Sequence, residues 1–383
     1  IGGNRVAHGG NGSEVRASLN IPFGGSGSSG SPGTGLRVSV LDRTDAGYID
    51  NPKTGQSDVN KATTRGGRVA LNAQINADWS VQAWALTQKF KAGGIGSQDV
   101  NGPSLTPVTK ELERSVTIPE TQDIGLDVVN LTIKGQAAGF SLVSSTTYQT
   151  VKAETNVDVS SSLGALFSAV LSIPNIGMQT KQLIDTKRWS QELRARSSAM
   201  GDRLDYEAGL FWTKEDSSNS LPPLDTFNTA TGAAMPLGLP IANAMLGTRY
   251  QEYSLFGNAT YAVTPQFDLL GGLRVSHDNQ HYTQDYKLAL LTNVPVALQQ
   301  DASNQKTTYL LSARWKPAAD TAIYGRIATG YRPGGPSALA PDVVPGGKQT
   351  FEPDTLTSYE LGFKSAFMGG KASVEAAVFT TED

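Results

Sequence analysis

The sequence predicts an all-β protein built as one antiparallel, up-and-down sheet of long strands. Apolar residues alternate with polar residues along most of the 383-residue chain, which is the side-chain period of a β-strand. The alternating segments reach the roughly 9–11 residues that a tilted strand needs to cross lipid. The connections are alternately short turns and long irregular loops. This combination predicts a transmembrane β-barrel.

Alternation and turns divide the chain into about fourteen complete strands, preceded at residues 1–12 by the end of another strand and a turn. Short turns such as 77–78, 199–202 and 368–370 join strands into hairpins. The expected strands are 14–25, 35–51, 65–76, 79–90, 124–135, 140–151, 187–198, 203–216, 250–263, 266–282, 307–317, 320–331, 355–367 and 371–381.

Composition agrees with one barrel domain over residues 1–383. The chain is 38% hydrophobic, with no cysteine and a formal charge of −3. A chain of this length usually predicts two or three soluble domains, but one closed sheet can absorb it. The modest apolar content suits strands that present only every second residue to lipid. No apolar run reaches the roughly 18–20 residues of a membrane-spanning helix, and we interpret 163–178 as a short loop helix or a folded loop.

Several phrases of the sequence closely resemble the barrel region of TonB-dependent outer-membrane receptors. They include DRTDAGYIDN, TGQSDVN, RGGRVAL, SLFGNATYAV, LLGGLRVSHD, IYGRIATGYRPGG, FEPDTLTSYELGFKS and VEAAVF, and so they span both ends of the chain. The resemblance implies a barrel of roughly 22 strands in bacterial outer-membrane lipid, of which this chain is a part. It also implies a plug domain, absent from this chain, through which the TonB energy-coupling complex acts.

The resemblance further implies a function in transport. Members of the family import scarce nutrients, and we expect a ferric siderophore or a similar ligand. A passive porin-like channel is the alternative. The chain begins at Ile1 without Met and shows no signal peptide, so we expect it to be a piece of a longer protein.

Charged residues on the polar face of the strands are expected to line the barrel lumen, because charge at mid-depth in lipid costs about 2–4 kcal/mol per Arg or Lys. We expect the opposite, lipid-facing set to include Trp189, Leu193, Leu210, Trp212, Leu273, Ile323, Ile327, Leu361, Phe363 and Val374. The candidate lumen-lining residues are Arg37, Arg43, Arg68, Glu192, Arg194, Arg196, Glu207, Arg274, Arg314, Arg326, Glu360 and Lys364.

Four long connections are the candidate ligand-contacting regions, because binding residues concentrate on loops held by a rigid scaffold. They are Ala92–Thr121, Thr155–Thr186, Ser217–Gly247 and Tyr286–Asn304.

Motifs for other functions have simpler interpretations. The GxGxxG at Gly25–Gly30 precedes Pro32 and another strand instead of a helix, so it is a turn and not a dinucleotide site. His277 and His281 would lie about 13 Å apart on a strand, too far to share a metal. The balance of 32 basic and 35 acidic residues indicates no nucleic-acid partner. We therefore predict no catalytic residue, cofactor or metal.

The chain alone is not expected to close into a ring. Strands shaped for a wider barrel would have to change curvature at every pair to meet. We therefore predict a C-shaped sheet in which the strand near Glu14–Phe23 does not pair regularly with the strand near Lys371–Thr381.

Overall fold

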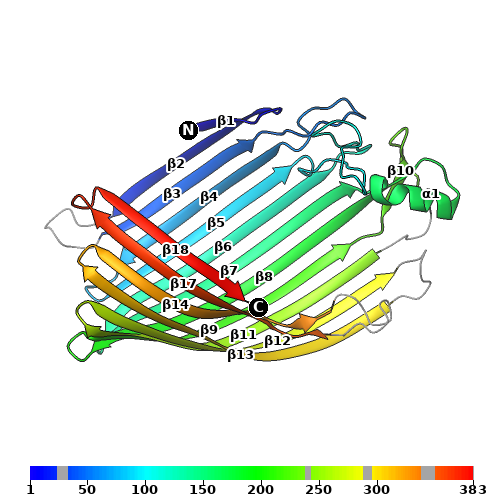
Figure 1. The fold of residues 1–383 in the computed structure, drawn as a ribbon. Helices are drawn as coiled ribbons and strands as arrows, with labels where there is room; N and C mark the ends of the chain where they lie inside the picture. The colour runs from blue at the N-terminus through cyan, green and yellow to red at the C-terminus, as the bar shows by residue number, and fades with distance from the viewer. Residues whose placement is uncertain (24–32, 238–242, 288–295, 338–349, 383) are drawn as a thin grey trace.

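A computed structural model describes residues 1–23, 33–237, 243–287, 296–337 and 350–382. The main element is a 16-stranded antiparallel sheet in which strand order follows the chain (Figure 1). Its long strands are β2 (Asn11–Phe23), β3 (Thr34–Asp45), β4 (Ala62–Gln74), β5 (Trp79–Ala92), β6 (Thr121–Ala137), β7 (Phe140–Asp158), β8 (Ile176–Ala199), β9 (Leu204–Leu221), β11 (Asn243–Thr264), β12 (Phe267–Lys287), β13 (Val296–Ala318), β14 (Thr321–Arg332), β17 (Asp354–Phe367) and β18 (Ala372–Glu382).

The remaining elements are short. β1 (Gly2–Arg5) pairs with β2, and β10 (Asp225–Asn228) pairs with the start of β8. β15 (Gly335–Pro336) and β16 (Thr350–Phe351) form a separate two-stranded sheet. A π-turn (Ser160–Gly164) and the seven-residue α1 (Ala165–Leu171) are the helical segments of the described chain, and none is long and apolar enough to cross a membrane.

The sheet confirms the predicted antiparallel fold with fourteen long strands. It curves so that β14, β17 and β18 lie in front of the earlier strands, and its two edges are β1 and β18 (Figure 1). Within the described residues, β18 pairs with β17 alone and forms no ladder with β2. The prediction of an open, C-shaped sheet is therefore confirmed.

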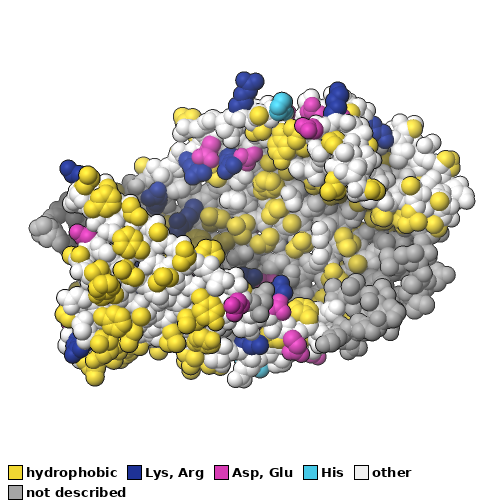
Figure 2. All heavy atoms as spheres, viewed as in Figure 1, with side chains coloured by type: hydrophobic (Ala, Val, Ile, Leu, Met, Phe, Trp, Pro, Cys, Tyr) yellow, Lys and Arg dark blue, Asp and Glu magenta, His cyan; other side chains and the backbone are white. Residues whose placement is uncertain are grey.

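One face of the sheet carries an apolar band. Cross-strand partners share a face, and the register aligns Leu193 with Leu210, Leu210 with Leu255, and Leu255 with Val275. The leucines of this row are 44–60% exposed. The ten residues predicted to face lipid all have the register of this face. Figure 2 shows hydrophobic side chains covering the outside over β14, β17 and β18.

The opposite face is polar and concave. Side chains converge on the concave side of a curved sheet and diverge on the convex side, so polar residues on the concave side become buried. Ser276 and Asp278 are each 1% exposed and Asp268 is 6% exposed, although all three are polar. Charged side chains are visible in the hollow in Figure 2. The apolar face is therefore the convex, outer one.

Aromatic residues border the apolar band at both ends. Tyr148 and Trp189, whose rings are 4.5 Å apart, lie toward the long loops, and Phe140 and Tyr206, 6.3 Å apart, lie toward the short turns. The eight residues from Phe140 to Tyr148 extend about 27 Å along β7, or roughly 20 Å vertically with the usual strand tilt. This height matches the apolar band of an outer-membrane barrel.

Above the aromatic border nearest the long loops, the same outer face becomes charged. We call this zone the charged belt; its members are Asp42, Arg65, Lys89, Lys91, Asp123, Lys152, Glu154, Lys181, Asp185, Lys187, Lys214, Asp216 and Arg249. The strands continue through it, and β8 is 24 residues long, or about 80 Å.

These extensions correct several predicted boundaries. β7 continues to Asp158 and β8 begins at Ile176, so nearly half of the loop expected over Thr155–Thr186 is strand. The apolar alternation stops at the aromatic border because lipid no longer surrounds the strand, whereas backbone pairing continues. The predicted loop helix is confirmed by α1, although residues 176–178 of that segment belong to β8.

The two faces make different predictions for a charge in the middle of β14. Ile327 is on the convex face and 38% exposed, so Ile327→Arg should destabilise the barrel by roughly 2–4 kcal/mol. The neighbouring Ala328→Arg places the same charge on the concave face and should cost much less. Denaturant unfolding in detergent or lipid would measure both variants. Equal midpoints for the two variants would contradict this assignment of the faces.

Candidate functional site: the concave face and the loop layer

The register places all twelve candidate lumen-lining residues on the concave face. Arg194 aligns with Gly209, Phe256 and Arg274 across three neighbouring pairs, and Arg326 aligns with Glu360. The same pairings place Arg37 and Arg43, Arg68, Glu192, Arg196, Glu207, Arg314 and Lys364 on this side.

Most of the twelve are matched by neighbouring carboxylates. Arg194 lies 2.7 Å from Glu192, and Lys364 lies 3.2 Å from Glu375. Arg196 and Arg326 lie 3.9 Å from Asp205 and Glu360. Arg43 pairs with Asp45, and Glu207 aligns with Arg196 across the β8–β9 pair. The face is therefore charged but close to balance over these strands.

Arg274 donates hydrogen bonds to three different side chains of the concave face. Its guanidinium donates to Glu252 at 2.8 Å and to Ser254 and Ser276 at 2.9 and 3.1 Å. It also lies over the ring of Phe211 at 5.1 Å. Because Glu252 is only 13% exposed, this charge-assisted network fixes both side chains.

Two buried carboxylates of this face were not predicted. Glu252 is the partner of Arg274, and Asp268 accepts from Arg314 at 2.9 Å and from Lys316 at 2.8 Å. Each lies on the polar face of its strand, and its basic partner lies on the same face of the adjacent strand. Matching the polar-face residues of successive strands would have found them.

Arg37 and Arg68 differ from the other cations among the twelve candidates. Arg37 donates to Ser18 and Ser39, at 3.4 and 3.5 Å, and Arg68 lies over the Trp84 ring at 4.8 Å. Among the described residues neither forms an ion pair within 4 Å. The concave face of β3 and β4 therefore carries positive charge available to an anionic group.

The long connections at one end of the sheet pack together into a second structure. We define this loop layer as residues 46–61, 93–120, 159–175 and 222–237, together with β10 and the first residues of β8. It contains several of the most buried apolar side chains in the described chain: Ile49 at 1%, Ile176 at 2%, Met178 at 0% and Phe227 at 3% exposure.

Arg114 is at the centre of the polar part of the loop layer. It donates to both carboxylate oxygens of Glu120, at 3.0 and 2.7 Å, and to Asp99 at 3.2 Å. It also donates to the carbonyl of Asp158 at 3.4 Å. Its side chain is 10% exposed and that of Glu120 is 3% exposed. The bidentate bond to Glu120 is the main cause that raises the pKa of Arg114 above its usual value.

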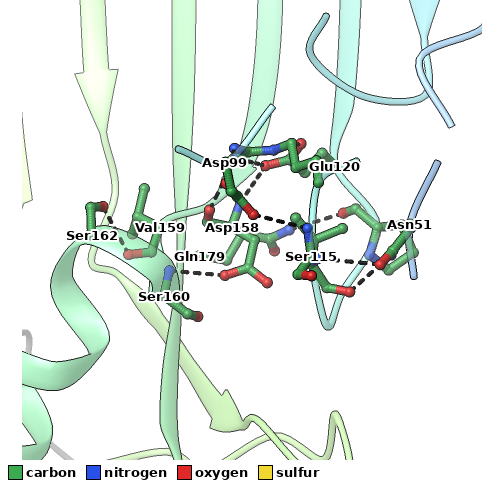
Figure 3. Close-up of polar contacts among 12 residues, drawn as sticks. Asn51, Asp99, Ser115, Glu120, Asp158, Val159, Ser160, Ser162 and Gln179 are labelled. Atoms are coloured by element: carbon green, nitrogen blue, oxygen red, sulfur yellow. Dashed lines mark hydrogen bonds and ion pairs between the residues drawn. The ribbon is translucent and has the colours of Figure 1, made fainter. Parts of the chain in front are cut away.

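The stretch around Arg114 joins four connections of the chain (Figure 3). Asp158, at the end of β7, accepts from the Thr117 backbone at 2.9 Å and from Ser160 at 2.9 Å. Asn51, from the β3–β4 connection, donates to the Val116 carbonyl at 2.9 Å. Thr117 donates to the Thr229 carbonyl at 3.3 Å. The layer is therefore cross-linked and not a set of independent loops.

The apolar part of the loop layer surrounds the start of β8. β10 aligns Phe227 with Gly177, where an added Cβ would lie 2.4 Å from the phenyl ring. Glycine at 177 therefore lets Phe227 close over the sheet. Ile176 and Met178 pack with Phe167 and Leu171 of α1 and with Leu224, which directly precedes β10.

A cavity of about 390 Å³ lies within the loop layer. Its lining includes Asn51, Gln56, Arg114, Thr117 and Glu120. This size is at the lower end for small-molecule sites, and the lining mixes polar side chains with apolar ones such as Val116 and Ile118. The cavity offers amide, hydroxyl and carboxylate groups and can hold a small polar moiety.

The four predicted ligand-contacting regions have different outcomes as loops. Ala92–Thr121 is correct, because β5 ends at Ala92 and β6 begins at Thr121. Ser217–Gly247 is too wide, since β9 continues to Leu221 and β11 begins at Asn243. In Tyr286–Asn304, residues 288–295 lie outside the described residues and Val296–Asn304 is strand. The β3–β4 connection, which contributes Ile49 and Asn51, was missed.

The two histidines of β12 lie outside both the concave face and the loop layer. His277 and His281 are on the convex face of β12, and His281 Nδ1 lies 2.7 Å from Asp301. Within the described residues, no group of three or more His, Asp or Glu side chains is positioned to hold a metal. Residues 24–32, which include the whole GxGxxG motif, lie outside the described residues.

Comparison with known proteins covers nearly the whole chain. The family model described as "TonB dependent receptor-like, beta-barrel" matches residues 6–382. The pesticin receptors of Yersinia enterocolitica and Yersinia pestis are 23% and 24% identical over 358 residues, covering 90% of this chain and 46% of each receptor.

Solved structures show the same fold. The ferric yersiniabactin uptake receptor FyuA of Yersinia pestis superimposes with a TM-score of 0.72 at 19% identity, covering 97% of this chain and 53% of that one. The siderophore receptor PiuA of Acinetobacter baumannii gives 0.69 at 14% identity, covering 96% and 55%. This chain therefore spans about half the length of the relatives it matches.

The Arg114 pair should be the main polar support of the loop layer. Arg114→Met keeps the side-chain length but leaves the Glu120 carboxylate buried without its cation, a loss of about 3–5 kcal/mol for buried pairs. Hydrogen exchange of the amides in 99–120 and 158–160 should therefore become faster. Arg249→Met, which breaks the exposed 2.9 Å pair with Asp216, should leave this exchange unchanged. Unchanged protection in Arg114→Met would show that the apolar contacts alone hold the layer.

Proposed function

Because the chain belongs to the TonB-dependent receptor β-barrel family, we propose that it forms part of the wall of a receptor that imports a ferric siderophore or a similar ligand. Proteins of this family are outer-membrane proteins of Gram-negative bacteria. The apolar band between two aromatic borders gives this chain the outer surface that such a location requires. Import would use energy relayed by the TonB complex.

The observation that carries the proposal is the match of the family model to residues 6–382. Support for the ligand class comes from the solved structures with the same fold. They are described as receptors for ferric yersiniabactin, for a siderophore and, in Pseudomonas aeruginosa, for ferripyoverdine. No covalent chemistry is part of the proposed function.

The concave face supplies the lumen wall in this proposal. Its twelve charged residues of both signs would contact a plug domain encoded elsewhere in a longer chain, because ion pairs and hydrogen bonds can hold such a domain without an apolar seal. Among the twelve candidates, Arg37 and Arg68 are cations without a carboxylate partner in the described residues, and so they remain available for carboxylates of the plug or of the ligand. TonB would act through the plug and not directly on this chain.

The loop layer supplies the ligand-facing surface. In outer-membrane barrels the long connections are extracellular and the short turns are periplasmic. The layer is fixed before ligand arrives, which reduces the conformational entropy lost on binding. The cavity beside Arg114 is the place in this layer where a polar group of a ligand would be held.

Energy dependence separates this proposal from a passive porin-like channel. The full-length receptor should be expressed in a strain without other siderophore receptors, and uptake of ⁵⁵Fe bound to catecholate, hydroxamate or phenolate siderophores should be measured. We expect uptake of one class, and its loss when TonB is deleted or the proton gradient is collapsed. The receptor itself is unaltered in the strain without TonB, so loss of uptake there would report the missing energy source and not a damaged plug interface.

Uptake that persists without TonB and does not discriminate among ligands would favour the channel. TonB-dependent uptake of a ligand without iron would keep the transport mechanism and correct the ligand class.

A further inference from the structure

The charged belt on the convex surface is not used by the proposed transport function. It lies between the apolar band and the loop layer, where the receptor meets the headgroups of the extracellular leaflet. Most of its cations have carboxylate partners. Lys91 lies 3.1 Å from Asp123, Lys181 lies 2.8 Å from Glu154, and Arg249 lies 2.9 Å from Asp216.

Arg65 and Lys89 break this pattern of matched charges. The β4–β5 register places the two cations directly opposite each other. Asp42 lies 2.9 Å from Arg65 on one side, but the next residue beyond Lys89 is Gly125. Among the described residues Lys89 forms no ion pair within 4 Å. Like charges directly opposite in a sheet are unfavourable, and an anion between them removes the cost.

The neighbouring pair of like charges in the belt shows the contrast. Asp123 and Glu154 also face each other, on β6 and β7. Each of these carboxylates has its own lysine, at 3.1 and 2.8 Å. The two carboxylates are therefore neutralised within the protein, whereas the Arg65–Lys89 pair is short of one negative charge.

A groove adjoins the two cations on the same convex surface. It has a volume of about 590 Å³, and its lining includes Val15, Val40, Gly67, Thr87 and Lys91. Val40, Gly67 and Thr87 lie two residues closer to the apolar band than Asp42, Arg65 and Lys89. A Cβ added at Gly67 would have only the Ser39 carbonyl within 4 Å, at 3.8 Å, so glycine leaves this groove open.

Lys89 and Lys91 also border a second cavity, of about 670 Å³, on the β6 side. The two lysines therefore stand between two hollows of the outer surface. Their exposed ammonium groups can reach a ligand that lies in either hollow. Charge above and an open apolar groove below together match an amphiphile with an anionic head.

We propose that Arg65, Lys89 and Lys91 bind the phosphate group of a lipid in the extracellular leaflet, with an acyl chain of that lipid in the groove over Gly67. Lipid surrounds the convex surface at this height, and phosphate supplies the missing negative charge. The inference requires the outer-membrane location of the chain but not the identity of any imported ligand. Its failure would therefore leave the transport proposal intact.

The test measures binding of lipid A with two phosphates to the full-length receptor in detergent by native mass spectrometry. Arg65→Gln/Lys89→Gln should weaken this binding roughly 10- to 30-fold, because the loss of each cation near a lipid headgroup lowers the affinity about three- to five-fold. Arg65→Lys/Lys89→Arg should restore it. Gly67→Leu should fill the groove and weaken binding of lipid A while leaving the cations in place.

The matched control is Lys187→Gln/Lys214→Gln, which removes two cations of the same belt. It should leave lipid A affinity unchanged, and lipid A without phosphates should not distinguish the Arg65/Lys89 variant from wild type. Equal losses in both double variants would reduce the site to general surface charge and overturn the proposal. If inorganic phosphate displaced lipid A at the same concentration, the ligand would be free phosphate, and the assignment of a lipid would be overturned. Unchanged lipid A binding in Arg65→Gln/Lys89→Gln would overturn it completely.

Discussion

Backbone hydrogen bonding in lipid is the constraint on which this structure depends. Hydrocarbon offers no partners for peptide N–H and C=O groups, so each strand must pair along its length with both neighbours. The antiparallel ladder from β2 to β18 gives each strand between these two a partner on both sides, although β13 pairs with β14 only from Leu310 to Ala318. Alternation of side chains then follows from the ladder, because each residue that faces lipid on one strand aligns with a lipid-facing residue on the next.

The same ladder serves two environments along one strand. On the outer face of β8, Leu193 and Trp189 lie in the apolar band, whereas Lys187 and Asp185 lie in the charged belt. Nothing in the backbone marks this change, because pairing continues across it. A strand can therefore be a membrane span, a lipid-headgroup surface and a support for extracellular loops in sequence. This explains why the loop layer is held at a fixed height above the membrane.

Alternation allowed the sequence to predict the strand order, the assignment of faces and the open edges. It worked where lipid forces every second residue to be apolar, as at Leu193 and Arg194. It failed between Ile176 and Asp185, where β8 passes through the loop layer and then the charged belt, so that lipid no longer makes every second residue apolar. The loop layer was beyond it as well. Arg114, Glu120 and Asp158 have no periodic spacing, and their contact depends on how the β5–β6 connection folds against the end of β7. Asn51 carried no local signal for its bond to Val116.

The cross-links around Arg114 also have a mechanical consequence. They join the β3–β4, β5–β6, β7–β8 and β9–β11 connections at a single place, so the loop ends of these hairpins cannot slide past one another unless a buried ion pair opens. This half of the wall therefore behaves as a stiff plate under load. If a force pulled on this wall from the lumen, the strands on either side of this plate would deform first.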